Sequence, residues 1–125
     1  MNENELSKII IDTAFDIYFE LGPGLLESVY EEILFHELKS KNLYVERQKS
    51  IEIDWKGKKL ALGFRADLIV NHKVLIELKS IEKIAPVHSK QVLTYLKLTN
   101  LKLGLLLNFN EAYFKHGISR IVNDL

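Results

Sequence analysis

The stretch FRADLIVNHKVLIELKS, residues 64–80, decides the fold of this chain. Apolar side chains alternate with other side chains on both sides of Asn71-His72-Lys73, a segment whose composition is typical of a turn. The pattern predicts two antiparallel strands joined by a tight hairpin. A three-residue turn centred on His72 sets the register, so that Val70 faces Val74.

This hairpin would bring two acidic side chains together. In the register centred on His72, Asp67 faces Glu77 and Arg65 faces Lys79. Directly opposed side chains have Cβ atoms about 4.5–5.5 Å apart, a distance at which two carboxylates repel each other. Three arrangements would offset the repulsion: a proton shared by the pair, the neighbouring basic side chains, or a divalent cation between the oxygens. The spacing favours the cation.

The same residues supply the chemistry of phosphodiester hydrolysis. Mg²⁺ prefers hard oxygen ligands and takes one or two carboxylates together with water and phosphate. Asp67, Glu77 and the carbonyl of Leu78 would provide three such oxygens. Lys79 lies two residues along the strand face from Glu77, where its ammonium would stabilise the attacking oxygen and the charge on the phosphate. The structural alternative is an exposed strand face with mixed charges.

The remaining sequence predicts an α/β domain. Apolar residues recur at helical spacing over about residues 4–21, 25–41 and 87–100, and at strand spacing over about 51–55, 60–70, 74–79 and 103–109. A helix that connects two strands of one sheet makes these strands parallel, so a mixed sheet is expected. The tail around Ile118, Ile121 and Val122 fits either an edge strand or a short helix.

Composition limits the class of protein. The 125 residues are 47% apolar and 27% charged, which suits one domain spanning residues 1–125. No apolar run approaches the roughly 20 residues that a membrane span needs, and the acidic N-terminus does not resemble a signal peptide. The absence of cysteine excludes disulfides and thiolate metal sites, and the histidines lack zinc-ligand spacing. We therefore expect a cytoplasmic protein without a membrane partner.

Charge is divided unevenly along the chain. Residues 1–37 contain nine acidic residues and one basic residue (−8), whereas residues 38–125 contain sixteen basic and eight acidic residues (+8). The positive half either binds a polyanion or attracts the acidic half within the fold. The main basic cluster consists of Lys56, Lys58 and Lys59, preceded by Arg47 and Lys49. It suits phosphate contacts, but an ordinary solvated turn also has this composition.

Several blocks of sequence resemble a known family. Asp67 and Glu77-Leu78-Lys79, within this order of elements, resemble the PD-(D/E)xK nuclease superfamily, although Ala66 replaces the proline of its name. GLLESVY, residues 24–30, resembles the pattern of the GxxExxY proteins, a small branch of that superfamily, and FRADLIV, IELKS, QVLTYLK and LGLLLNFN are similar to it as well. The resemblance implies a restriction-endonuclease-like αβββαβ core, with a mixed sheet flanked by helices and an extra N-terminal helix.

The resemblance also implies an activity, namely Mg²⁺- or Mn²⁺-dependent hydrolysis of phosphodiester bonds, usually in DNA. Carried across to this sequence, Asp67 and Glu77 would be metal ligands and Lys79 the catalytic lysine. Glu27 would complete the acidic cluster, often through water. Gln91 and Tyr95 match a Gln-x-x-x-Tyr signature whose residues orient the site or contact nucleic acid, and they share one helix face.

Other functions fit the same resemblance. A catalytically inactive nuclease-fold module would bind protein or nucleic acid, and the zero net charge suits that function. Small domains of this superfamily commonly dimerise, so a homodimer is an expected partner. An enzyme that acts on RNA or a nucleotide would carry the same residues.

Overall fold

The computed structural model describes residues 1–125, apart from the side chain of Leu62. The elements follow in the order α1 (Glu3–Leu21), α2 (Glu27–Ser40), β1 (Val45–Trp55), β2 (Lys58–Val70), β3 (Val74–Lys79), α3 (Pro86–Thr99), β4 (Leu103–Asn108), the 3₁₀ helix η1 (Phe114–Gly117) and β5 (Ile118–Val122). This order confirms the predicted α/β class. Ile118, Ile121 and Val122 lie in the edge strand β5, so that alternative for the tail is confirmed, and η1 precedes them.

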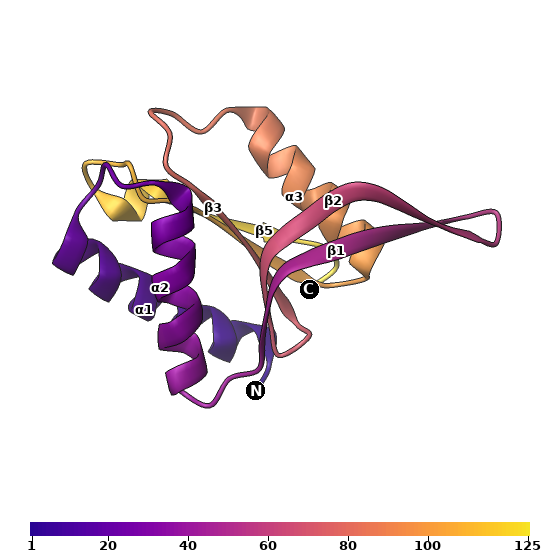
Figure 1. Cartoon of the computed structure of the whole chain (residues 1–125), viewed down its shortest axis with the longest axis horizontal. Coiled ribbons are helices and arrows are strands. Elements are labelled where there is room, and N and C mark those ends of the chain that lie inside the picture. Colours follow the sequence, from indigo (N-terminus) through magenta and orange to yellow (C-terminus); the bar gives the residue numbers. More distant parts are fainter.

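The strands form one five-stranded mixed sheet in the order β1-β2-β3-β4-β5. β3 and β4 are parallel, and the other neighbouring strands are antiparallel. The parallel pair follows from α3, which crosses over the sheet between these strands, as predicted. Figure 1 shows α1 and α2 on one side of the sheet and α3 on the other.

Helix boundaries follow from local capping. Asn2 and Glu5 form a reciprocal capping box at the start of α1, with hydrogen bonds of 2.8 and 3.0 Å. Gly22 ends α1 with a φ of +71°, a conformation that glycine adopts without strain. Pro86 occupies the first turn of α3, where the missing N–H costs no helical hydrogen bond.

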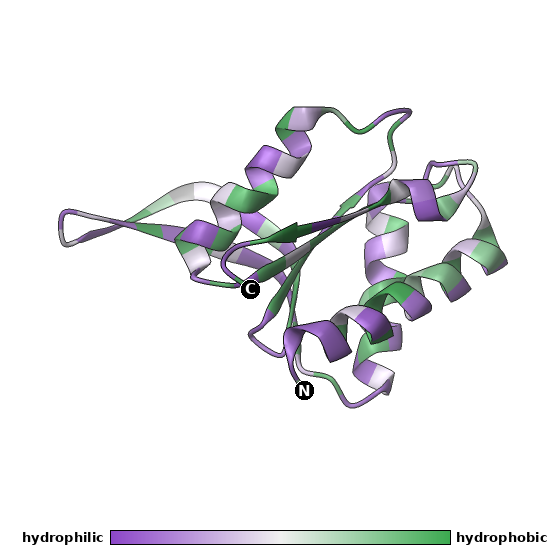
Figure 2. Cartoon of the chain, turned by 180° about the vertical axis from the view of Figure 1, so that it is seen from behind, coloured by the Kyte–Doolittle hydropathy of each residue, from purple (hydrophilic) through white to green (hydrophobic). Residues whose placement is uncertain are grey.

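Two apolar cores cover the two faces of the sheet. The core beneath α1 and α2 includes Leu6, Ile10, Tyr30, Leu34, Ile76 and Leu105. The core beneath α3 includes Ala66, Leu75, Val92, Tyr95, Leu96 and Leu106. Figure 2 shows that the central strands are largely hydrophobic, as expected for strands buried on both faces. Within the described residues, no helix has both the length and the apolar character needed to cross a membrane.

The central hairpin has the predicted register over its inner part. Val70 pairs with Val74, and the ladder between β2 and β3 ends at the pair Leu68–Ile76. The predicted pairing of Arg65 with Lys79 is wrong. β2 leaves β3 beyond Leu68 and stays with β1, so that Arg65 pairs with Ser50 and Lys79 pairs with Asn108 of β4.

Candidate active site

Asp67 and Glu77 lie opposite each other where β2 and β3 separate. The backbone N–H of Asp67 donates to Oε1 of Glu77 at 3.2 Å, and the backbone N–H of Leu78 donates to Oδ2 of Asp67 at 2.9 Å. The two carboxylates therefore accept hydrogen bonds from backbone N–H groups that a longer ladder between β2 and β3 would otherwise pair. The two predicted metal ligands converge, and Leu78, whose carbonyl was the third expected ligand, is bound to the pair through its N–H.

Burial and mutual repulsion keep this pair from ionising freely. Glu77 is 7% exposed. Its desolvation and the negative charge of Asp67 raise the pKa of the Glu77 carboxyl to about 8, although Lys79 opposes the shift. Desolvation also raises the pKa of Asp67, against the hydrogen bond from Leu78. Without a cation, Glu77 is therefore mostly protonated near neutral pH.

Lys79 is held at the end of β3 by β4 and the segment that follows it. The backbone N–H of Phe109 donates to the carbonyl of Lys79 at 2.9 Å. The fully buried Asn108 accepts a hydrogen bond from the N–H of Ile81 at 3.1 Å and donates to its carbonyl at 2.9 Å. Lys79 lowers the pKa of Glu77, so its ammonium lies within electrostatic reach of the acidic pair. The sequence did not predict the role of Asn108.

Tyr95 approaches the acidic pair from α3. The negative charges of Glu77 and Asp67 contribute to a raised pKa of the Tyr95 hydroxyl, after the larger effect of burial, and Gln91 opposes the rise. Gln91 and Tyr95 therefore share one helix face, with Tyr95 near the carboxylates. His88 has a local role, because its Nδ1 accepts a hydrogen bond from the N–H of Ala85 at 2.9 Å at the start of α3.

A sequence model described as the PD-(D/E)XK nuclease superfamily matches residues 4–121. The chain belongs to the PD-(D/E)XK nuclease superfamily. No curated protein sequence and no solved structure gives a significant match. The predicted restriction-endonuclease-like fold, a mixed sheet flanked by helices with an additional N-terminal helix, is confirmed.

Glu27, the helix glutamate expected in this PD-(D/E)XK chain, is exposed at the start of α2. It lines a small groove with Ser80 and Asn110, next to the end of β3. Ser80 Oγ donates to the carbonyl of Leu25 at 2.6 Å, which ties the residue after Lys79 to the loop before Glu27. Among the described side chains, Glu27 forms no hydrogen bond or ion pair, so it lies beside the residue that follows β3 without contacting the acidic pair.

Tyr30 of the GLLESVY block has a structural role. Its hydroxyl donates to the carbonyl of Gly22 at 2.6 Å and accepts from the N–H of Leu25 at 3.1 Å. Its ring stacks on Phe109, with centroids 4.3 Å apart. Tyr30 thus fixes the turn between α1 and α2 and, through that turn, the start of the helix that presents Glu27.

Glu31 is an acidic residue near the site that sequence reasoning missed. It is 6% exposed and lies one helical turn after Glu27. Arg47 Nε donates to Glu31 Oε2 at 2.7 Å, and Arg47 also pairs with Glu32. The negative charge of Glu31 contributes to the raised pKa of Asp67. This ion pair joins the acidic N-terminal part of the chain to the basic part, so at this contact the two halves attract each other within the fold.

Gln48 connects Glu31 to the acidic pair. Its Nε2 donates to Glu31 Oε1 at 2.6 Å and to Asp67 Oδ1 at 3.2 Å. Gln48 has a φ of +51°, an uncommon value for a residue other than glycine, and its neighbours in β1 pair with the neighbours of Asp67 in β2. No local pattern signals this position, because the contacts join α2, β1 and β2.

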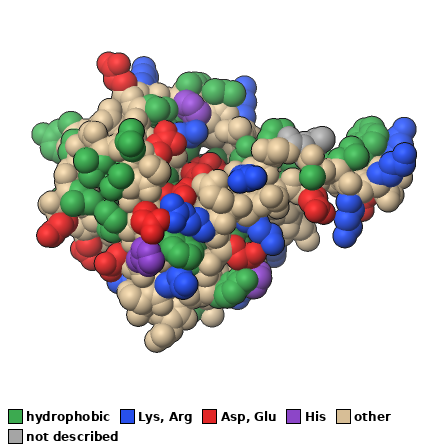
Figure 3. Space-filling model, in the orientation of Figure 1, with side chains coloured by type: hydrophobic (Ala, Val, Ile, Leu, Met, Phe, Trp, Pro, Cys, Tyr) green, Lys and Arg blue, Asp and Glu red, His purple; other side chains and the backbone are tan. Residues whose placement is uncertain are grey.

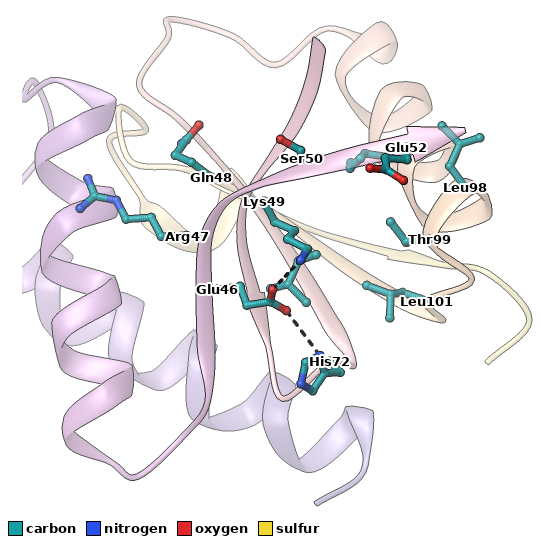
Figure 4. Close-up of a pocket in the computed structure, with 12 residues that line it drawn as sticks. Glu46, Arg47, Gln48, Lys49, Ser50, Glu52, His72, Leu98, Thr99 and Leu101 are labelled. Carbon is teal, nitrogen blue, oxygen red and sulfur yellow. Dashed lines mark ion pairs between the residues drawn. The ribbon is translucent and has the colours of Figure 1, made fainter. Parts of the chain in front are cut away.

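A groove of about 920 Å³ lies beside the edge strand β1 and not at the acidic pair. Figure 4 shows Arg47 pointing toward α2, whereas Lys49 and Glu46 point toward His72 on the other side of the strand. Lys49 and His72 both contact the Glu46 carboxylate, at 2.9 and 3.4 Å. The Lys49 ammonium and the Glu46 carboxylate neutralise each other, so Asp67 and Glu77 remain the candidate site.

Proposed function

We propose that this chain is a divalent-metal-dependent nuclease of the GxxExxY branch that hydrolyses phosphodiester bonds of DNA. One observation carries the proposal, namely the convergence of the buried carboxylate of Glu77 and the half-buried carboxylate of Asp67, with the pKa of Glu77 raised to about 8. Such a pair lacks sufficient neutralising charge of its own. A bound cation would let both carboxylates ionise.

The donor chemistry fits Mg²⁺ or Mn²⁺. Carboxylate and carbonyl oxygens are hard ligands, and Mg²⁺ usually takes only one or two protein carboxylates, with water and phosphate completing its coordination. Asp67, Glu77 and the carbonyl of Leu78 would hold the ion, and Glu27 would act through water. When bound, the ion would polarise the phosphate and make a water molecule more acidic.

The side chains around the pair would stabilise charge in the transition state and orient the substrate. The ammonium of Lys79, which acts electrostatically on Glu77, would stabilise negative charge as it develops on the attacking oxygen and the phosphate. Tyr95 and Gln91 face the same space from α3 and would orient the nucleic acid. Asn108 would keep Lys79 in position by fixing the chain that follows β3.

A second candidate is a catalytically inactive module of the same fold that binds protein or nucleic acid. Among the described side chains, no group of three histidine, cysteine or acidic residues is placed to hold one metal ion, and Glu27 remains outside the pair. We would expect such a module to form a homodimer in the cytoplasm. A titration of the chain with Mn²⁺ separates the candidates, because the module requires no metal binding at millimolar concentration.

Cleavage of plasmid and single-stranded DNA with Mg²⁺ or Mn²⁺ tests the nuclease directly. Lys79→Ala should slow cleavage by about 100-fold or more, the cost of losing a charge that stabilises a transition state. Lys73→Ala is the matched control, because Lys73 lies exposed in the turn at the opposite end of β3. The nuclease proposal fails if wild type cleaves no faster than Lys79→Ala. RNA in the same assay distinguishes the substrate class.

A further inference from the structure

The hairpin formed by β1 and β2 extends beyond the rest of the sheet. β1 and β2 remain paired as far as Trp55–Lys58, whereas β2 pairs with β3 only between Leu68 and Val70. The distal part of the hairpin therefore projects as a two-stranded arm (Figure 1). We call residues 51–64 the arm. An isolated two-stranded ribbon is only marginally stable in water, so we expect an arm of this length to have a function.

One face of the arm is largely apolar and accessible, with Lys58 at its far end. Ile53 pairs with Leu60 and Trp55 pairs with Lys58, which places these four side chains on the same face. Trp55 is 60% exposed, and Leu60 and Phe64 are each 37% exposed. A cluster of exposed apolar and aromatic side chains on a projecting element is typical of an interaction surface.

The tip of the arm is basic. Lys56, Lys58 and Lys59 are all exposed, and among the described side chains none of them has an ion-pair partner within 4.0 Å. Figure 3 shows Lys or Arg side chains at the far end of the arm, with acidic side chains also on it. Lys56 Nζ lies 5.6 Å from the centroid of the Trp55 ring, so the charge and the aromatic surface are adjacent. Two such tips would repel each other, whereas a polyanion would be attracted.

The apolar face of the arm leads to the acidic pair. The Phe64 ring lies 5.7 Å from the ring of Tyr95, and Tyr95 is electrostatically coupled to Glu77 and Asp67. A ligand lying along the arm would therefore reach the candidate active site at its base. Proteins bind single-stranded nucleic acid with lysines placed along its phosphate backbone and with aromatic rings that stack on its bases.

We propose that the arm binds a single-stranded nucleic-acid segment next to the phosphate that a cation at the acidic pair would hold. Lys56 and Lys58 contact its phosphates, and Trp55 stacks on an unpaired base. The proposal rests on the nuclease function proposed above and adds to it the part of the substrate that is recognised. It also explains why the arm keeps an accessible tryptophan among lysines.

Fluorescence anisotropy with a labelled 20-nucleotide single strand and the matching duplex, in EDTA so that no cleavage occurs, tests the arm. Replacing Lys56 and Lys58 by glutamine should reduce the slope of log affinity against log salt by about 2, or roughly one per phosphate contact. Trp55→Ala should weaken single-strand binding by about tenfold, and duplex binding less. Circular dichroism and thermal melting verify that each variant is folded.

The control replaces Lys73 and Lys102 by glutamine, which removes the same charge from exposed positions at the end of β3 and β4 far from the arm. Its salt slope should stay that of wild type. Equal losses in the two double variants, or no loss in the arm variants, would overturn the arm proposal. The arm proposal would also be overturned if wild type bound neither probe. It would be overturned as well if wild type sedimented as a dimer that Trp55→Ala dissociates, because the arm would then bind a second copy of the chain.

The cleavage assay keeps this proposal separate from the nuclease proposal. If Lys79→Ala is inactive while the arm variants bind like wild type, the nuclease stands and the arm proposal is wrong. If the arm variants lose binding while Lys79→Ala cleaves like wild type, the arm binds nucleic acid and the catalytic assignment is wrong.

Discussion

Asp67 and Glu77 each accept a backbone hydrogen bond from the other's strand, through Leu78 N–H at 2.9 Å and Asp67 N–H at 3.2 Å respectively. The reciprocal bonds fix both carboxylates where the strands separate. The proposed cation would bind between side chains whose positions the backbone already sets. This geometry underlies the predictions that follow.

Glu77→Gln should weaken Mn²⁺ binding by at least about tenfold, because a neutral amide replaces one of two anionic ligands. Isothermal titration calorimetry at neutral pH measures the change. Glu82→Gln is the matched control, since Glu82 is exposed in the loop after β3 and should bind Mn²⁺ as wild type does. Equal affinities for wild type and Glu77→Gln would show that the ion binds elsewhere.

The metal-free protein should lose stability as the pH rises from about 4.5 to about 8. The pKa of Glu77 is raised from 4.5 to about 8, so the folded state holds a proton that the unfolded state releases within this window. The free energy of unfolding should fall by up to about 1.4 kcal/mol per pH unit there. The raised pKa of Asp67 acts in the same direction. Urea denaturation in EDTA at several pH values measures the slope.

Glu77→Gln is neutral at every pH, so most of that slope should disappear in this variant. Saturating Mn²⁺ should also flatten the slope in wild type, because the ion stabilises the ionised pair. A slope that is the same in wild type and Glu77→Gln would contradict the assignment of the titration to Glu77.

Arg47→Met should destabilise the fold by about 3 kcal/mol, because it leaves the buried carboxylate of Glu31 without its cation. Chemical denaturation measures the loss. Lys8→Met removes the cation of an exposed pair with Asp12, and it should change stability by less than about 0.5 kcal/mol. Similar effects of the two substitutions would mean that Glu31 is solvated.

Glu27→Gln should leave stability within about 0.5 kcal/mol of wild type, because Glu27 is exposed and forms no contact among the described side chains. If Glu27 acts on the ion through water, the same substitution should slow DNA cleavage by about tenfold or more. The cleavage assay and a urea melt, run on one preparation, measure both effects. Unchanged cleavage would remove Glu27 from the site.

The sequence predicted the parts of the site that depend on local spacing. The turn at His72 set the register of the hairpin, which brought Asp67 and Glu77 together, and the crossover helix made β4 parallel to β3. The pairing of Arg65 with Lys79 failed because β2 stays with β1 after the ladder ends. Local alternation does not reveal where two strands separate.

The rest of the site depends on tertiary contacts. Glu31 looks like any other acidic residue of an amphipathic helix, and its burial becomes visible only when Arg47 and Gln48 of β1 lie against it. Asn108 looks like a strand end, yet it fixes the segment after Lys79. The projection of the arm is equally hidden, because its alternating pattern is that of a strand within a sheet.

A Mn²⁺ soak of crystals of the wild-type chain tests the central claim most directly. Anomalous diffraction should show a peak between the carboxylates of Asp67 and Glu77, with Lys79 directed toward the same space, and the peak should vanish in Glu77→Gln. No peak at this pair in fully soaked crystals, or a peak only at surface residues elsewhere, would contradict the assignment of a metal-dependent active site to Asp67 and Glu77.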